Sequence, residues 1–223
     1  MHWHSDEDEE KQLHPAGEMV DLVFTIRCKA LPVDHAWALY VAIQHELPWF
    51  GEEQRAGIHP IHTVESAHGW SRPESPEELV YLPRRTRLIL RVPLKRIDEA
   101  GQLEGKSLSV ADCSMQLVKA EIRPLRPGNS LVSKGVAMLA EEDENSFIQR
   151  MLTELHAMGI TAKRVLPGRT KRLATPQGGI TCCRLGVEGL KASESLQLQE
   201  QGLGAYRHLG CGIFIPQKEM LRI

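Results

Sequence analysis

Residues 201–216 read QGLGAYRHLGCGIFIP and form the most informative segment of the chain. Four glycines surround a basic and aromatic centre, and the apolar run 213–215 follows directly. Glycine adopts backbone conformations and allows close approaches that a β-carbon forbids. The segment therefore predicts one of two structures. The first is a tight turn before a final strand, and the second is a loop whose backbone lies against a bound partner and leads into a buried strand.

The elements before and after this segment follow one repeated order of strand, helix, strand, strand, helix, strand. In the second half, the pattern predicts strand 131–139, helix 143–158, strand 163–173, a turn at 178–179, strand 180–187, helix 191–201 and a last strand from residue 213. In the first half, it predicts strand 19–27, a helix capped by Asp34, strands 57–64 and 85–92, a short helix 94–100 and strands within 107–121. Two successive βαββαβ units predict an α+β fold with two tandem ferredoxin-like domains.

This order predicts three parts: an acidic tail at 1–18, an N-terminal domain at 19–122 and a C-terminal domain at 123–223 that carries the glycine-rich loop. A linker is expected at 123–127, which reads RPLRP. Residues 1–19 hold six acidic residues and one lysine, a net charge of −5, whereas the whole chain has −2. The tail is therefore expected to be disordered, and the remaining chain is weakly basic.

The composition is that of a soluble globular protein, with 42% hydrophobic and 25% charged residues in 223. No apolar run reaches the roughly 20 residues that cross a bilayer, so no membrane association is expected. The acidic N-terminus does not match a signal peptide. The five cysteines form no CxxC pair, which favours a cytoplasmic protein over a disulfide scaffold or a zinc site. The sequence predicts no cofactor and no metal.

The chain resembles the repeat-processing endoribonucleases of CRISPR systems, the sixth Cas family within the repeat-associated RNA-binding proteins. The match is carried by GLG at 202–204 and GCGIF at 210–214, which lie just before the last predicted strand, as in that family. The segments LPVDHAWALY at 31–40, LPW at 47–49, GIHP at 57–60 and GLKASESL at 189–196 resemble one subgroup of it. The resemblance covers residues 20–216 and implies the same tandem ferredoxin-like fold.

The resemblance implies metal-independent cleavage of a CRISPR precursor transcript within its repeats. A base removes the proton from a ribose 2′-hydroxyl, which attacks the adjacent phosphate and gives a 2′,3′-cyclic phosphate and a 5′-hydroxyl. It further implies that the protein retains the mature guide RNA. A non-catalytic RNA-binding subunit of a CRISPR effector complex is the alternative. An unrelated enzyme with two ferredoxin-like units is a third interpretation.

Two histidines are candidates for the proton transfers, because histidine titrates near neutrality. His35 opens the first predicted helix and resembles the catalytic histidine of some family members. His59 starts the second predicted strand, from which it would face the same cleft. A surface position in a first helical turn explains His35 equally, and a strand-end histidine bonded to backbone explains His59. Tyr40 would orient a phosphate, although its spacing in the helix favours a core role.

RNA is expected to contact two regions of the C-terminal domain, and the family resemblance makes a repeat stem-loop the expected partner, with other effector subunits as further partners. The binding residues that we predict in the glycine-rich loop are Gly202, Gly204, Tyr206, Arg207, His208, Gly210 and Gly212. Those in the basic predicted hairpin are Lys163, Arg164, Arg169, Lys171 and Arg172. A solvated polar face explains the hairpin charges without RNA. Arg85, Arg87 and Arg91 alternate along one face of a strand, and Arg123 and Arg126 are expected at the cleft between the domains.

Overall fold

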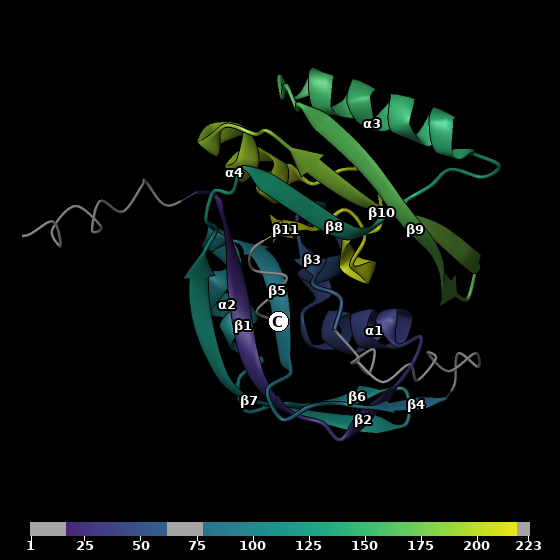
Figure 1. Ribbon diagram of the computed structural model, residues 1–223. Coiled ribbons are helices and arrows are strands. Elements are labelled where there is room, and N and C mark those ends of the chain that lie inside the picture. The colour runs from purple at the N-terminus through teal and green to yellow at the C-terminus, as the bar shows by residue number, and fades with distance from the viewer. Residues whose placement is uncertain (1–16, 62–77, 218–223) are drawn as a thin grey trace, which may run out of the picture.

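A computed structural model describes residues 17–61 and 78–217 of the chain (Figure 1). The predicted tail therefore falls almost wholly outside the described residues, as do His62, His68 and the end of the predicted strand 57–64. In the described part, no helix is both long enough and apolar enough to span a bilayer.

The first unit is a five-stranded antiparallel sheet in the order β3-β5-β1-β7-β6. Its strands are β1 (Met19–Arg27), β3 (Gly57–Ile58), β5 (Arg87–Pro93), β6 (Ser107–Val110) and β7 (Cys113–Pro124). Its helices are α1 (Ala36–Glu46) and α2 (Ile97–Gly101). Strands β1, β3, β5 and β7 with these two helices give the βαββαβ order, and β6 is an added edge strand.

The two faces of this sheet differ in polarity because successive side chains of a strand point to opposite faces. On β5, Leu88, Leu90 and Val92 are fully buried in the core that α1 covers. The opposite face carries Arg91 of β5 and Asp21 of β1, which are directly paired in the ladder. The first sheet therefore has an apolar outer face under its helices and an inner face that combines apolar side chains with this charged pair.

The second unit is a four-stranded antiparallel sheet in the order β11-β8-β10-β9. Its elements are β8 (Ser130–Ala137), α3 (Glu144–Ala157), β9 (Arg164–Thr175), β10 (Gly178–Glu188), α4 (Ala192–Gln201) and β11 (Phe214–Pro216). Figure 1 shows α3 and α4 on the outer side of this sheet. Both units thus have the ferredoxin-like strand order, and the predicted fold class is confirmed.

Helix α3 illustrates why the second half of the chain was readily predicted. The Asp143 side chain accepts a hydrogen bond from the Ser146 N–H at 2.7 Å, which satisfies one of the unpaired donors of the first turn. Phe147, Met151 and Leu155 recur at helical spacing and are all buried. The helix therefore begins and ends where capping and periodicity place it.

Three local predictions were wrong. Asp34 does not cap α1: the cap residue is His35, without a side-chain cap bond, and the Asp34 carboxylate instead accepts a hydrogen bond from the backbone of Ala174. Residues 178–179 begin β10, and the turn lies at 176–177. Strand β7 continues through Pro124, two residues into the predicted linker. The division of the chain at residue 123 stays a prediction.

A small sheet of two strands, β2 (Ala30–Pro32) and β4 (Leu79–Tyr81), was not predicted, because each strand has only three residues. The glycine-rich loop between α4 and β11 contains the 3-10 turn η4 (Arg207–Leu209). This turn contacts β3 and α1 of the first unit. The loop therefore belongs to the second unit in sequence but packs against the first.

Candidate functional site

The four glycines of the loop are required by its own packing. All have positive φ, between 63° and 85°, a region that side chains rarely adopt. An added β-carbon at Gly210 would lie 2.9 Å from Pro60, and one at Gly212 would lie 2.1 Å from the carbonyl oxygen of Leu203. These distances are too short, so glycine at these two positions lets the loop fold on itself and against the first unit. The predicted contacts of all four glycines with RNA stay a prediction.

The loop displays two ring side chains beside α1. Tyr206 has φ of 65°, which is uncommon for a residue other than glycine, and its side chain is exposed. His208 is half-buried, and its ring centroid lies 4.4 Å from that of Tyr40, which is buried on α1 as predicted. Burial lowers the pKa of His208. Two of the predicted RNA-contacting side chains are thus presented at the junction of the two units.

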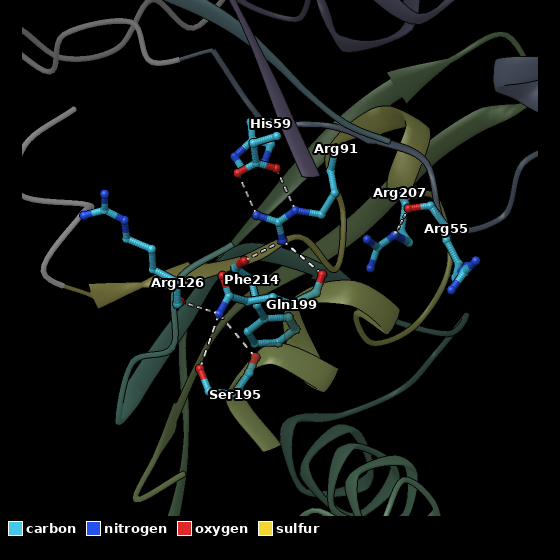
Figure 2. Close-up of polar contacts among 9 residues, drawn as sticks. Arg55, His59, Arg91, Arg126, Ser195, Gln199, Arg207 and Phe214 are labelled. Carbon is cyan, nitrogen blue, oxygen red and sulfur yellow. Dashed lines mark hydrogen bonds and ion pairs between the residues drawn. The ribbon is translucent and has the colours of Figure 1, made fainter. Parts of the chain in front are cut away.

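Arg207 behaves differently from its neighbours in the loop, because only 5% of its surface is exposed. Its Nε donates a hydrogen bond to the carbonyl oxygen of Arg55 at 3.2 Å, and its two Nη atoms have no partner among the described residues (Figure 2). Burial lowers the pKa of Arg207 to about 9. With the loop folded in this way, a phosphate does not reach this guanidinium, so the predicted contact of Arg207 with RNA requires the loop to move.

His35 lies at the start of α1 with 8% of its surface exposed. Its Nδ1 lies 2.9 Å from the carbonyl oxygen of Pro32, and a carbonyl oxygen only accepts, so Nδ1 is the donor. In the neutral ring, this hydrogen bond makes Nε2 the atom that accepts a proton. His35 is therefore held in the tautomer that a general base with Nε2 as its acceptor requires.

His59 belongs to a buried polar cluster on the inner face of the first sheet. Its Nε2 donates to Asp21 Oδ1 at 3.1 Å, and Arg91 donates to both oxygens of Asp21, at 2.8 and 3.0 Å (Figure 2). Burial lowers the pKa of His59, against the opposing effect of Asp21. Burial alone would raise the pKa of Asp21, but Arg91 and His59 hold it well below its usual range.

Arg91 also joins the two units. Its Nη1 donates to the carbonyl oxygens of Gln199 in α4 and Phe214 in β11, at 3.0 and 2.8 Å (Figure 2). These contacts direct the Arg91 guanidinium into the protein, and only 1% of the surface of Arg91 is exposed. His59 therefore helps to fix a structural junction, and these contacts favour His35 over His59 as a catalytic candidate. The assignment of either histidine stays a prediction.

In the described ranges, no three His, Cys, Asp or Glu residues gather as a metal site.

The five predicted cations of the hairpin formed by β9 and β10 do not form one cluster. Arg164 starts β9 and pairs with Glu188 at 3.0 Å, and Lys163 packs beside Gly189. Lys171 and Arg172 lie towards the turn, and at about 3.3 Å per residue they are roughly 25 Å from Arg164 along the strand. Their end of the hairpin is the one that contacts α1. The exposed residue Arg169 lies between the two groups.

A cleft of about 280 Å³ lies between the inner faces of the two sheets. Its charged lining residues include Arg85, Arg87, Arg123 and Lys134, and isoleucine and proline side chains form much of the rest. Burial, with Lys171 and Arg184 nearby, lowers the pKa of Lys134 to about 7. Arg123 lines this cleft as expected from the sequence, whereas Arg126 is not among its lining residues. Lys134 was missed, although a single charge within the apolar strand 131–139 was a detectable signal.

The chain matches known proteins over nearly its whole length. Residues 20–219 match the family model described as Cas6 Crispr. The CRISPR-associated endonuclease Cas6 of Myxococcus xanthus (strain DK1622) is 30% identical over 204 residues, which cover 92% of this chain and 84% of that protein.

Solved structures with the same fold include one titled CRISPR associated protein Cas6, with a TM-score of 0.63 at 14% identity over 89% of this chain and 99% of that one. Another, titled as a RAMP protein binding different RNA substrates, has a TM-score of 0.62 at 12% identity over 88% of this chain and 98% of that one. A Cas6-related protein from Pyrococcus furiosus has a TM-score of 0.60 at 14% identity over 88% of this chain and 97% of that one. With the family match over residues 20–219, these likenesses lead to one conclusion: the chain belongs to the Cas6 family of CRISPR-associated proteins.

Proposed function

We propose that this protein is a metal-independent endoribonuclease that cleaves CRISPR precursor RNA within its repeats and retains the mature guide RNA. The observation that carries the proposal is the 30% identity, over 92% of the chain, with a protein named CRISPR-associated endonuclease Cas6. The five cysteines, all of them free thiols, fit an activity in the reducing cytoplasm, where the precursor transcript is made.

In the proposed reaction, His35 is the general base. Its Nε2 removes the proton of a ribose 2′-hydroxyl, and the oxygen attacks the adjacent phosphorus. The tautomer imposed by the Nδ1 bond to Pro32 supports this role. A cation is needed near the negative charge that develops on the phosphorane, and Lys171 and Arg172 are the predicted RNA-contacting cations on the hairpin end nearest to α1.

The proposed RNA-binding surface combines three features around the junction of the units. They are Tyr206 and His208 of the glycine-rich loop, the turn end of the β9–β10 hairpin and the cationic cleft between the sheets. Cations at this surface favour RNA because their contacts with phosphates release counterions from it. Such a surface would recognise a stem-loop through its shape and its phosphate backbone.

The test of this function is incubation of the protein with the repeat RNA of its own CRISPR array and with a control RNA of the same composition but scrambled sequence. We expect a single cut in the repeat and none in the control. If the repeat RNA is bound but not cut, the protein is instead a non-catalytic RNA-binding subunit of an effector complex. If no stem-loop RNA is bound at low salt, the proposed function is wrong.

The hairpin makes an internal comparison possible. The double substitution Lys171→Gln with Arg172→Gln is expected to weaken repeat RNA binding about 10-fold and to reduce the slope of log affinity against log salt by about 2. The matched change, Lys163→Gln with Arg164→Gln, is expected to have a smaller effect because Glu188 already neutralises Arg164. Filter binding at several salt concentrations measures both. Equal losses for the two variants would contradict an RNA site centred on the turn end of the hairpin.

A further inference from the structure

Three histidines lie where the two units meet, and their surroundings differ. His59 is hydrogen-bonded to Asp21, and His35 is hydrogen-bonded through Nδ1 to the carbonyl oxygen of Pro32. His208 has ring contacts, but no hydrogen bond of its ring joins it to another described residue. It is also the most exposed of the three, since the other two are 8% exposed. His208 is therefore the junction histidine whose ring nitrogens are most available to a ligand.

The position of His208 is fixed relative to α1. Its ring lies against Tyr40, and the loop residues on either side anchor it to the first unit: Arg207 is bonded to Arg55, and Gly210 packs on Pro60. Tyr40 follows His35 by five residues on the same helix, a rise of about 7.5 Å. The loop thus places a second histidine against α1, the helix whose N-cap residue is His35.

The proposed cleavage also requires a general acid. Attack of the 2′-oxygen expels the 5′-oxygen of the next nucleotide, and an alkoxide is a poor leaving group unless it receives a proton. Histidine can supply this proton because its ordinary pKa lies near neutral pH, and the negative charge of a bound phosphate favours the protonated ring against the burial that lowers the pKa of His208.

We propose that His208 is the general acid of the RNA cleavage reaction. This rests on the proposed function, with His35 as the base. The O2′–H proton passes to His35 as O2′ forms its bond to phosphorus. The P–O5′ bond breaks, its electron pair stays on O5′, and the His208 imidazolium gives its proton to O5′. The products are a 2′,3′-cyclic phosphate, a 5′-hydroxyl, protonated His35 and neutral His208, and exchange with solvent restores both rings.

The experiment compares two repeat RNAs that differ in one atom at the mapped cut. One has the natural 5′-oxygen, and the other has sulfur in its place, since a thiolate leaves without protonation. Single-turnover rates are measured for the unchanged protein, His208→Ala, His208→Gln, His35→Ala and the control His45→Ala. The His45 side chain is 84% exposed near the end of α1 and is not part of the site. RNA affinity and thermal melting are measured for each variant.

On the oxygen substrate, both His208 variants are expected to be slower by about 10²–10⁴-fold at saturating protein, with melting near that of the unchanged protein. On the sulfur substrate, they should approach the unchanged rate, whereas His35→Ala stays slow on both. Three results would overturn the inference: an unchanged rate for His208→Ala, an equal loss on both substrates, or recovery by His208→Gln. A protein that cuts neither RNA would instead overturn the proposed function itself, and this inference with it.

Discussion

Replacement of His35 by alanine is expected to slow cleavage of the repeat RNA by about 10²–10⁴-fold and to change RNA affinity little. The variant lacks the base that takes the 2′-hydroxyl proton, whereas the hairpin and loop that contact the RNA are unchanged. It also loses the hydrogen bond to Pro32, so a stability loss of about 1 kcal/mol is expected. Single-turnover rates with saturating protein separate the chemical step from binding.

The control for this prediction is His45→Ala in the same helix, which should cleave at the unchanged rate. A near-normal rate for His35→Ala in a folded protein would contradict the assignment. The other predicted histidine, His59, would then be the next residue to replace. Because His59 is bonded to Asp21, its substitution needs a stability measurement alongside the rate.

Replacement of Arg91 by methionine is expected to lower the free energy of unfolding by about 3–5 kcal/mol. The substitution keeps much of the apolar stem of the side chain. It leaves the mostly buried Asp21 carboxylate without its bidentate arginine partner. It also leaves the carbonyl oxygens of Gln199 and Phe214 without the donor that joins the two units. Denaturant unfolding followed by circular dichroism measures the loss.

The matched control is Arg96→Met, the same chemical change in an ion pair with Glu99 whose side chains are 38% and 44% exposed. Exposed pairs contribute little, so a loss below about 1 kcal/mol is expected there. Equal losses for the two variants would contradict the structural role of Arg91. Partial recovery when Asp21→Asn is added to Arg91→Met would support the unpaired carboxylate as the main cause.

The regular elements were predictable because each carries its own periodic signal. Strand β5 and helix α3 lie within a few residues of their predicted bounds, since alternation and helical spacing are local properties. The start of α1 was misplaced because the capping signal of Asp34 is local, whereas its actual partner, Ala174, is 140 residues away. Strands β2 and β4 were missed because three residues are too few to show a period.

The arginines of the predicted strand 85–92 show why the site was only partly predictable. Arg85, Arg87 and Arg91 were expected on one face of a strand; Arg87 and Arg91 lie on the inner face of β5, whereas Arg85 lies in the turn before the strand, which begins at Arg87. Arg85 and Arg87 line the cleft, but Arg91 is buried at the junction, where the carbonyls of Gln199 and Phe214 meet it. Side-chain alternation gives the face, but the depth of a residue depends on what the second unit places over it.

The glycine-rich loop was also predicted only in part. Its position before the last strand was predicted, and its glycines were interpreted as points of backbone approach to RNA. The structure shows that the backbone at Gly210 and Gly212 already approaches protein, namely Pro60 and Leu203. Such contacts were not predictable, because they depend on a fold in which the loop crosses to the other unit.

The chemical identity of the RNA ends tests the central proposal most directly. The repeat RNA is incubated with the protein in excess EDTA, and the two fragments are analysed by mass spectrometry. Proton transfer by His35 without a metal predicts an undiminished rate, a 2′,3′-cyclic phosphate on the upstream fragment and a 5′-hydroxyl on the downstream one. Loss of cleavage in EDTA, or a 3′-hydroxyl opposite a 5′-phosphate, would contradict it.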